Sequence, residues 1–242
     1  MLVIAEPPHR PAPPPGACPP LCAVSVFDLD RTLTRRPTYS LFLIRSALVL
    51  APWRLLLVPL LAPVALLYLL RLLPRRRMKE AMHAVTLGRR LPEQTVAALA
   101  DGFARRLARG GLYEQGLALL AAERAAGRRL VLATAAPHFY AAAIARHLGI
   151  ADLVATQSRW RDGHLTPAID GENCHGPAKA RRLAHFLAPL AASRAALHVR
   201  FYTDDASDLP ALAWCDEAVA VNPGAKLRQA ASERGWRILD WR

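Results

Sequence analysis

The chain has 242 residues, of which 32 are lysine or arginine and 19 are aspartate or glutamate, so its formal net charge is +13. This length is enough for one full-sized domain with an insertion, and for a core that needs no disulfide bonds. The positive charge favours polyanionic partners: nucleic acid, an anionic membrane face or a phosphate-bearing substrate. The four cysteines show no CxxC pair and no metal-ligand spacing, which argues against a zinc site or a disulfide framework and indicates a reducing, cytoplasmic setting.

The first twenty residues differ in composition from the rest of the chain. They begin with MLVIA and continue through a proline-rich stretch from Pro7 to Pro20. The apolar run is much shorter than a secretory signal requires. We therefore predict a disordered tail over residues 1–20, most simply an extension without a function of its own.

Short apolar runs alternate with helix-like stretches from Cys22 onward. The predicted strands are CAVSVFD, LVLAT (130–134), LVATQ (153–157), VRFYT (199–203) and AVAV (218–221). The predicted helices lie at about 112–127, 138–148, 177–188, 208–214 and 224–234. This alternation predicts an α/β fold, a Rossmann-like parallel sheet with helices on both faces. In such sheets ligands bind beyond the carboxyl ends of the strands, where we expect Asp28, Thr134 and Asp204.

About a hundred residues separate the first strand from LVLAT, which is far too long for one crossover. Residues 35–110 are therefore predicted to form an inserted helical cap, and residues 21–34 and 111–242 the core. The second half of the insertion carries apolar residues at helical spacing, at Val96, Leu99, Phe103 and Leu107.

The segment 46–73 of this cap is unusually apolar. Residues 55–70 carry no charge, and arginines bound them on both sides, with a basic cluster following at 75–79. The run is shorter than the roughly 20 residues that span a bilayer, and prolines interrupt it, which argues against a simple transmembrane helix. We predict a helix or hairpin in the interface of an anionic membrane. The alternative is an apolar cap helix packed on the core or on a second subunit.

Two carboxylates follow the first predicted strand, in Asp28-Leu29-Asp30-Arg31-Thr32. A carboxylate can attack phosphorus and form an aspartyl phosphate, and a second one two residues later points to the same side, where it can donate and then accept a proton. Thr134 ends a later strand, where a hydroxyl and the adjacent backbone N–H groups can hold phosphate. Taken alone, each of these patterns also fits an ordinary turn or helix cap.

Lys179 and a cluster of acids complete the set of candidates. Lys179 lies just inside a predicted helix, and its ammonium can neutralise phosphate and nucleophile together; the simpler interpretation is an exposed lysine. Asp204 and Asp208 stand four residues apart where the chain turns into a helix, and hard oxygen ligands of this kind suit Mg²⁺.

Occurring in this order, the four pieces resemble the four motifs of the haloacid dehalogenase superfamily, over roughly residues 22–222. The resemblance is closest to subfamily IB, the branch with phosphoserine phosphatase and the bacterial phosphatidylglycerophosphatase C proteins. It implies a C1-type cap, Mg²⁺ as cofactor, Asp28 as nucleophile and Asp30 as general acid and base. It further implies substrate binding by Thr32, Thr134, Ala135 and Lys179, and a metal site formed by Asp28, Asp30, Asp204 and Asp208. Arg31 and Asp205 depart from the family, which often has glycine and a small residue at these positions.

The resemblance implies a Mg²⁺-dependent phosphomonoester hydrolase that acts through an aspartyl phosphate. Our first hypothesis for the substrate is a lipid phosphate such as phosphatidylglycerophosphate, met at the inner face of the cytoplasmic membrane. A soluble phosphatase for phosphoserine or a similar metabolite is the alternative. A non-catalytic phosphate- or membrane-binding protein is disfavoured because every catalytic residue is present. No helix-turn-helix, zinc or aromatic-platform signal supports a nucleic-acid partner, and the oligomeric state stays open.

Overall fold

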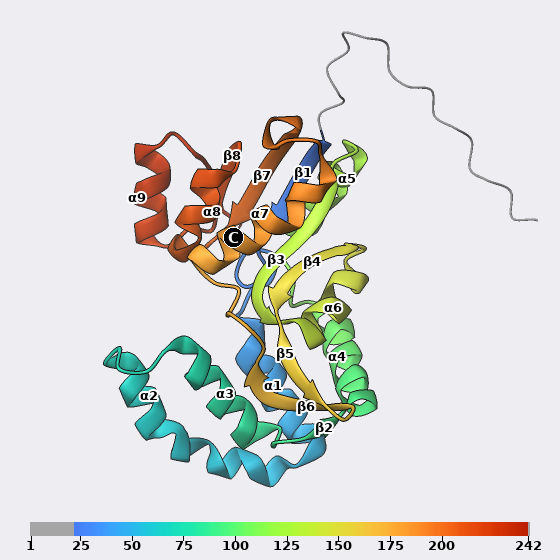
Figure 1. Ribbon diagram of the computed structural model, residues 1–242, viewed down its shortest axis with the longest axis vertical. Coiled ribbons are helices and arrows are strands. Elements are labelled where there is room, and N and C mark those ends of the chain that lie inside the picture. The colour runs from blue at the N-terminus through green and yellow to red at the C-terminus, as the bar shows by residue number, and fades with distance from the viewer. Residues whose placement is uncertain (1–21, 242) are drawn as a thin grey trace, which may run out of the picture.

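The computed structural model describes residues 22–241. Figure 1 shows two parts, an α/β body and a mainly helical cap, with the carboxyl ends of the central strands directed toward the cap. The tail predicted over residues 1–20 lies outside the described residues.

Six parallel strands form the central sheet of the body. Their order is β4-β3-β1-β7-β8-β9, with β1 (Cys22–Phe27) near the middle. The others are β3 (Arg129–Pro137), β4 (Asp152–Thr156), β7 (Leu197–Thr203), β8 (Glu217–Val221) and β9 (Arg237–Leu239). The predicted parallel α/β fold is confirmed; only the short edge strand β9 was not predicted.

Both faces of the sheet are covered by apolar packing. Val24 and Val26 of β1 face one layer, whereas Phe27 faces the other and stacks on Tyr202 with ring centroids 4.6 Å apart. This alternation follows from the two-residue period of a strand. The first layer is covered by α7 (Pro177–Leu187), α8 (Leu209–Trp214) and α9 (Ala225–Glu233), and the second by α5 (Glu114–Ala125) and α6 (His138–His147). Single turns of 3-10 helix, η2 (Ala188–Leu190), η3 (Arg194–Ala196) and η4 (Ala206–Asp208), lie in the connections.

The insertion after β1 is helical, as predicted, and it also carries a small sheet. Its helices are α1 (Thr38–Leu50), the 3-10 helix η1 (Pro52–Leu61), α2 (Ala62–Leu69), α3 (Arg75–Thr86) and α4 (Glu93–Ala108). A hairpin of β5 (Ser158–Arg161) and β6 (His164–Ile169) pairs with β2 (Leu91–Pro92) in an antiparallel sheet. Residues 158–169, which the sequence assigned to the core, therefore pair with a strand of the insertion.

An aromatic cluster joins cap and body. Phe42 of α1 stacks on Tyr140 of α6 at 4.6 Å between ring centroids, and meets Phe103 of α4 edge to face at 5.4 Å. Such pairs add about 0.5–1.5 kcal/mol each beyond the burial of apolar area. The cluster fixes the start of α1 above the carboxyl edge of the sheet.

Large apolar side chains are exposed between α1 and α3, and we call Val49, Trp53, Leu56, Leu60, Leu69 and Leu72 together the apolar strip. Leu56 is 80% exposed and Leu69 is 75% exposed. Within residues 22–241, Pro52–Leu69 is the one helical stretch long and apolar enough to cross a membrane, with a mean hydropathy of 1.7 and only 6% of it buried. The alternative in which this stretch packs on the core is therefore wrong.

Candidate active site

Pairing of β1 with β7 brings two distant carboxylates together at the carboxyl edge of the sheet. Asp28 directly follows β1, and Asp204 directly follows β7. The hydroxyl of Thr32 lies between them, 3.4 Å from Asp28 Oδ2 and 3.4 Å from Asp204 Oδ1. The backbone N–H of Asp204 donates to this hydroxyl at 3.0 Å, which fixes the Thr32 side chain.

Lys179 bridges two carboxylates, those of Asp28 and Asp208. Its Nζ donates to Asp28 Oδ1 at 2.8 Å and to Asp208 Oδ2 at 2.7 Å, and all three side chains are buried. Although burial lowers the pKa of Lys179, the carboxylates of Asp208 and Asp28 outweigh it and hold this pKa above its usual range. Thr203 also donates to Asp208 Oδ2, at 2.8 Å. Lys179 is therefore a charged, fixed group and not an exposed lysine.

The remaining carboxylate oxygens are poorly neutralised. Burial raises the pKa of Asp28 above the usual aspartate range, and the contact with Lys179 opposes this only in part. Burial raises the pKa of Asp204 to about 8, and the charge of Asp28 adds to the shift. The second oxygen of Asp208, Oδ1, is buried with no hydrogen-bond partner. A buried carboxylate with too few positive or hydrogen-bonding partners favours the binding of a proton or a cation.

The donor set fits Mg²⁺ bound together with a phosphate. No cage of three or more histidine, cysteine or acidic side chains occurs in residues 22–241. Mg²⁺ needs no such cage, because it commonly binds through one or two carboxylates and keeps water and substrate phosphate as its other ligands. Asp28 and Asp204 offer those carboxylates.

Asp30 is held by the first residue of the cap helix. Its Oδ1 accepts hydrogen bonds from Thr38 N at 2.8 Å and Thr38 Oγ1 at 2.7 Å. The Thr38 hydroxyl in turn lies 3.0 Å from the hydroxyl of Tyr140. The N-terminus of α1 thus stabilises the Asp30 carboxylate and orients it.

The loop that begins at Thr134 lies at a bulge near the end of β3. The Thr134 hydroxyl accepts a hydrogen bond from Ala136 N at 3.0 Å, so this side chain shapes its own turn. The carbonyl of Ala135 accepts bonds from Thr156 Oγ1 at 2.9 Å and from Lys79 Nζ at 2.7 Å. A lysine from the cap therefore reaches the predicted phosphate loop of the core.

The sequence did not single out Thr38, Tyr140, Lys79 or Asn173 for the site. Lys79, on α3, also donates to Asn173 Oδ1 at 2.8 Å. Burial, reinforced by the charge of Arg75, lowers the pKa of Lys79 to about 7. A lysine kept in a chain whose basic residues are nearly all arginine was the one available signal.

The two departures from the family pattern have local explanations. Arg31 has a φ of 61°, in the left-handed region where glycine is free of strain, which accounts for the glycine common at this position. The side chain of Asp205 accepts a hydrogen bond from Ser207 N at 2.8 Å and caps the turn η4. Neither residue replaces a group of the site.

Residues 25–213 match the haloacid dehalogenase-like hydrolase family. The chain belongs to this family. The predicted membership of the superfamily is thereby confirmed, and the relatives below include one from the phosphoserine phosphatase branch.

Two curated relatives and one solved structure illustrate the similarity. The hydrolase is 39% identical over 120 residues to phosphoserine phosphatase SerB1 of Mycobacterium tuberculosis, a match that covers 48% of this chain and 37% of that protein. It is 32% identical over 201 residues to protein CicA of Caulobacter vibrioides, covering 79% of this chain and 82% of the relative. A crystal structure of a Bordetella pertussis protein of unknown function superposes with a TM-score of 0.80 and 28% identity, covering 91% of this chain and 99% of that one.

Proposed function

We propose that this hydrolase is a Mg²⁺-dependent phosphatase that cleaves phosphomonoesters through an aspartyl phosphate on Asp28. The observation that carries the proposal is the double contact of Lys179 with Asp28 and Asp208. It places a fixed positive charge beside a carboxylate that can act as a nucleophile. Asp30 supplies a proton for the leaving oxygen, and Asp204 supplies a carboxylate that can bind Mg²⁺.

The first half-reaction forms the covalent intermediate. With Oδ1 of Asp28 held by Lys179, Oδ2 attacks phosphorus, so that an Asp28–phosphorus bond forms as the bond from phosphorus to the leaving oxygen breaks. Asp30 protonates the leaving oxygen, because Thr38 holds only one of its carboxylate oxygens and leaves the other available. Lys179 offsets the negative charge that Asp28 and the phosphoryl group bring together.

The second half-reaction returns the enzyme to its starting state. Water attacks the phosphorus of the aspartyl phosphate, Asp30 accepts the proton of that water, and the bond to Asp28 breaks to release phosphate. The proposed Mg²⁺ ligands are the carboxylates of Asp28 and Asp204 and the main-chain carbonyl of Asp30, with Asp208 as an outer group. When bound, the ion supplies positive charge that offsets the repulsion between nucleophile and phosphate.

Phosphate release by the wild type and Asp28→Asn tests this function. We would assay phosphatidylglycerophosphate, phosphatidic acid, phosphoserine and an aryl phosphate, each with Mg²⁺ and with EDTA. We expect release that requires both Mg²⁺ and Asp28. Equal release by the variant would contradict the mechanism, whereas no release from any substrate by folded wild type would favour a binding protein.

A lipid phosphate is our first candidate substrate, and the apolar strip supports it. The strip exposes long apolar side chains, and two exposed arginines, Arg75 and Arg77, follow it at the start of α3, whereas Arg76 is bound to Glu80 and to the Ile169 carbonyl. An apolar surface next to a basic cluster suits the interface of an anionic membrane, with about 1 kcal/mol added for each basic residue near the surface. We therefore propose peripheral binding at the inner face of the cytoplasmic membrane. Phosphoserine is the second candidate, favoured by the name of the relative SerB1.

Vesicle binding by Leu56→Ser tests this membrane contact, with Leu117→Ser as the matched control. Leu56 is 80% exposed in the strip, whereas Leu117 is 40% exposed on α5 of the body. Burying one leucine contributes about 1.5–3 kcal/mol, so Leu56→Ser should lower partitioning onto phosphatidylglycerol vesicles by at least about tenfold. The control should bind like the wild type. Equal binding by both variants would contradict the membrane role of the strip.

A further inference from the structure

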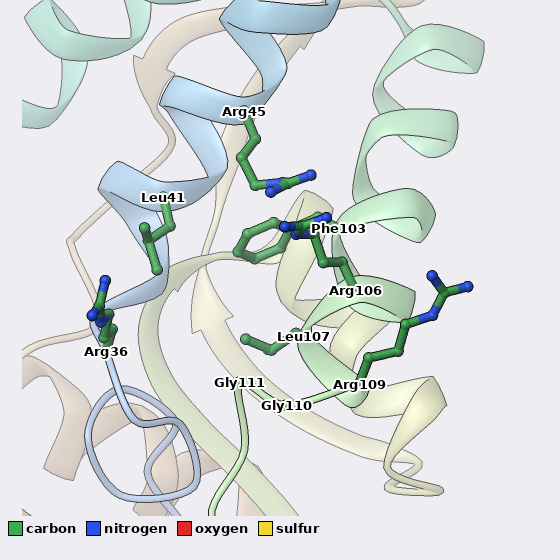
Figure 2. Close-up of a pocket in the computed structure, with 9 residues that line it drawn as sticks. All are labelled: Arg36, Leu41, Arg45, Phe103, Arg106, Leu107, Arg109, Gly110 and Gly111. Carbon is green, nitrogen blue, oxygen red and sulfur yellow. The ribbon is translucent and has the colours of Figure 1, made fainter.

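A pocket of about 460 Å³ lies between α1, α4 and the two chain segments that connect cap and body. Figure 2 shows the residues that line it, which are Arg36, Leu41, Arg45, Phe103, Arg106, Leu107, Arg109, Gly110 and Gly111. None of them belongs to the candidate active site. The neighbouring residue Arg35 joins the two connections, since its backbone N–H donates to the Gly111 carbonyl at 2.9 Å.

Four exposed arginines line the pocket. Within residues 22–241, the guanidinium groups of Arg36, Arg45, Arg106 and Arg109 make no ion pair or hydrogen bond. No aspartate or glutamate lines the pocket. In Figure 2 the guanidinium groups of Arg45 and Arg106 lie close together, whereas Arg36 lies at the other end of the pocket and Arg109 points away from it. Because like charges repel, the arrangement of Arg45 and Arg106 favours an anion between them.

Two arginines directly beside the pocket do have partners. Arg105, one residue before Arg106, forms an ion pair with Asp101. Arg35, one residue before Arg36, donates from Nε to the Leu112 carbonyl at 3.1 Å. The arginines beside the pocket are thus used within the fold, whereas those that line it are free to bind a ligand.

The floor of the pocket is apolar, and one side leads toward the surface of the cap. Phe103 and Leu107 are buried beneath the arginines. Leu41, Arg45 and Leu48 stand at spacings of four and three residues on α1 and so share one helix face. Leu48 is 54% exposed. The face thus continues from the pocket toward the apolar strip.

We propose that this pocket is a second, non-catalytic site for a ligand that carries adjacent phosphate charges. Arginine is suited to this task because its planar fork binds phosphate oxygens through two parallel hydrogen bonds. Two sources share this chemistry: the head group of an anionic phospholipid and a soluble polyphosphate. The apolar continuation along α1 matches the lipid. The proposal goes beyond the proposed function and does not depend on it.

Titration of the full chain with inorganic pyrophosphate tests the site. Calorimetry in EDTA at low ionic strength compares the wild type with Arg45→Gln/Arg106→Gln and with a control of equal charge, Arg105→Gln/Arg181→Gln. Each charged hydrogen bond contributes about 1.5–3 kcal/mol, so the pocket variant should bind pyrophosphate at least about tenfold more weakly. The control should stay within about twofold of the wild type, since loss of exposed charge alone has a small effect.

Two further readouts separate this site from the active site and identify the source. With Mg²⁺ present, both variants should hydrolyse a soluble aryl phosphate at the wild-type rate; a loss confined to the pocket variant would overturn the claim that the site is non-catalytic. Equal weakening of pyrophosphate binding in both variants would overturn the proposal, because it would show only attraction by net charge.

Vesicles of phosphatidic acid in phosphatidylcholine distinguish a lipid head group from a soluble polyphosphate. Vesicle binding that pyrophosphate displaces, and that the pocket variant lacks, identifies a lipid head group; retained binding identifies a soluble polyphosphate.

Discussion

At the residue scale, the ion pairs of Lys179 balance carboxylates that are otherwise buried without a counter-charge. Removing one partner from a buried ion pair costs about 3–5 kcal/mol, because the other charge stays desolvated. We expect Lys179→Met to lower the free energy of unfolding by this amount and to abolish phosphate release. Urea denaturation measures the loss, with Lys226→Met, at an exposed lysine, as the control. Wild-type stability of Lys179→Met would contradict this account of the charges.

Asp204 gives the metal-free protein a characteristic dependence on pH. Burial raises its pKa from 3.8 to about 8, so the folded state holds a proton that the unfolded state has lost. Stability in EDTA should therefore fall as the pH rises from about 4 to about 8. Asp204→Asn removes this contribution, and at pH 8 we expect the variant to be more stable than the wild type by at least about 1 kcal/mol.

Thermal unfolding of both proteins in EDTA, at several pH values, measures this difference. Adding Mg²⁺ at pH 8 should stabilise the wild type and leave Asp204→Asn nearly unchanged, because a ligand stabilises only the state that binds it. Parallel pH profiles for the two proteins would contradict the raised pKa. Equal stabilisation by Mg²⁺ would remove Asp204 from the proposed metal site.

The sequence predicted the charged residues of the site better than the residues that orient them. Asp28, Lys179 and Asp204 stand at ends of strands or starts of helices, where a parallel sheet gathers them at one edge. Thr38 and Tyr140 are 102 residues apart, and their contact depends on how α1 of the cap lies over α6. No spacing rule in the sequence encodes that packing.

At the scale of elements, α3 links the cap to the phosphate loop through Lys79. Its two hydrogen bonds, to the Ala135 carbonyl and to Asn173, join α3 to segments of the body. We expect Lys79→Met to lower kcat/KM by about 10- to 100-fold, since two hydrogen bonds of about 0.5–1.5 kcal/mol each are lost. Arg77→Met removes an exposed charge from the same helix and serves as the control. Equal kinetics for the two variants would contradict a special role for Lys79.

Long apolar patterns were predictable, whereas short or polar elements were not. The helix predicted at 138–148 is observed at His138–His147, and the strand predicted at 199–203 lies inside Leu197–Thr203. The hairpin of β5 and β6 was missed because β5, SRWR, has four residues and no alternation of apolar and polar side chains. Its pairing with β2 is a tertiary contact that local pattern does not reveal.

At the scale of the whole molecule, the candidate active site lies where the sheet meets the cap, and the segment η1, which carries three residues of the apolar strip, runs along the end of the cap remote from the sheet (Figure 1). The net charge of +13 favours polyanionic partners, but it does not by itself distinguish a nucleic acid from an anionic membrane or a phosphate-bearing substrate. The fold separates these charges: Lys179 and Lys79 lie at the site, whereas four arginines from two distant segments line the pocket between α1 and α4. Only the topology brings those arginines together.

If Asp28 carries the phosphoryl group during turnover, the aspartyl phosphate can be trapped chemically. The enzyme is mixed with Mg²⁺ and an aryl phosphate, quenched in acid within one turnover, reduced with borohydride and sequenced by tandem mass spectrometry. Reduction converts an aspartyl phosphate to homoserine. We predict homoserine at position 28, none at position 30, and none in Asp28→Asn or without substrate. Phosphate release with an unmodified Asp28, or a phosphoryl group trapped on another residue, would show that Asp28 is not the nucleophile.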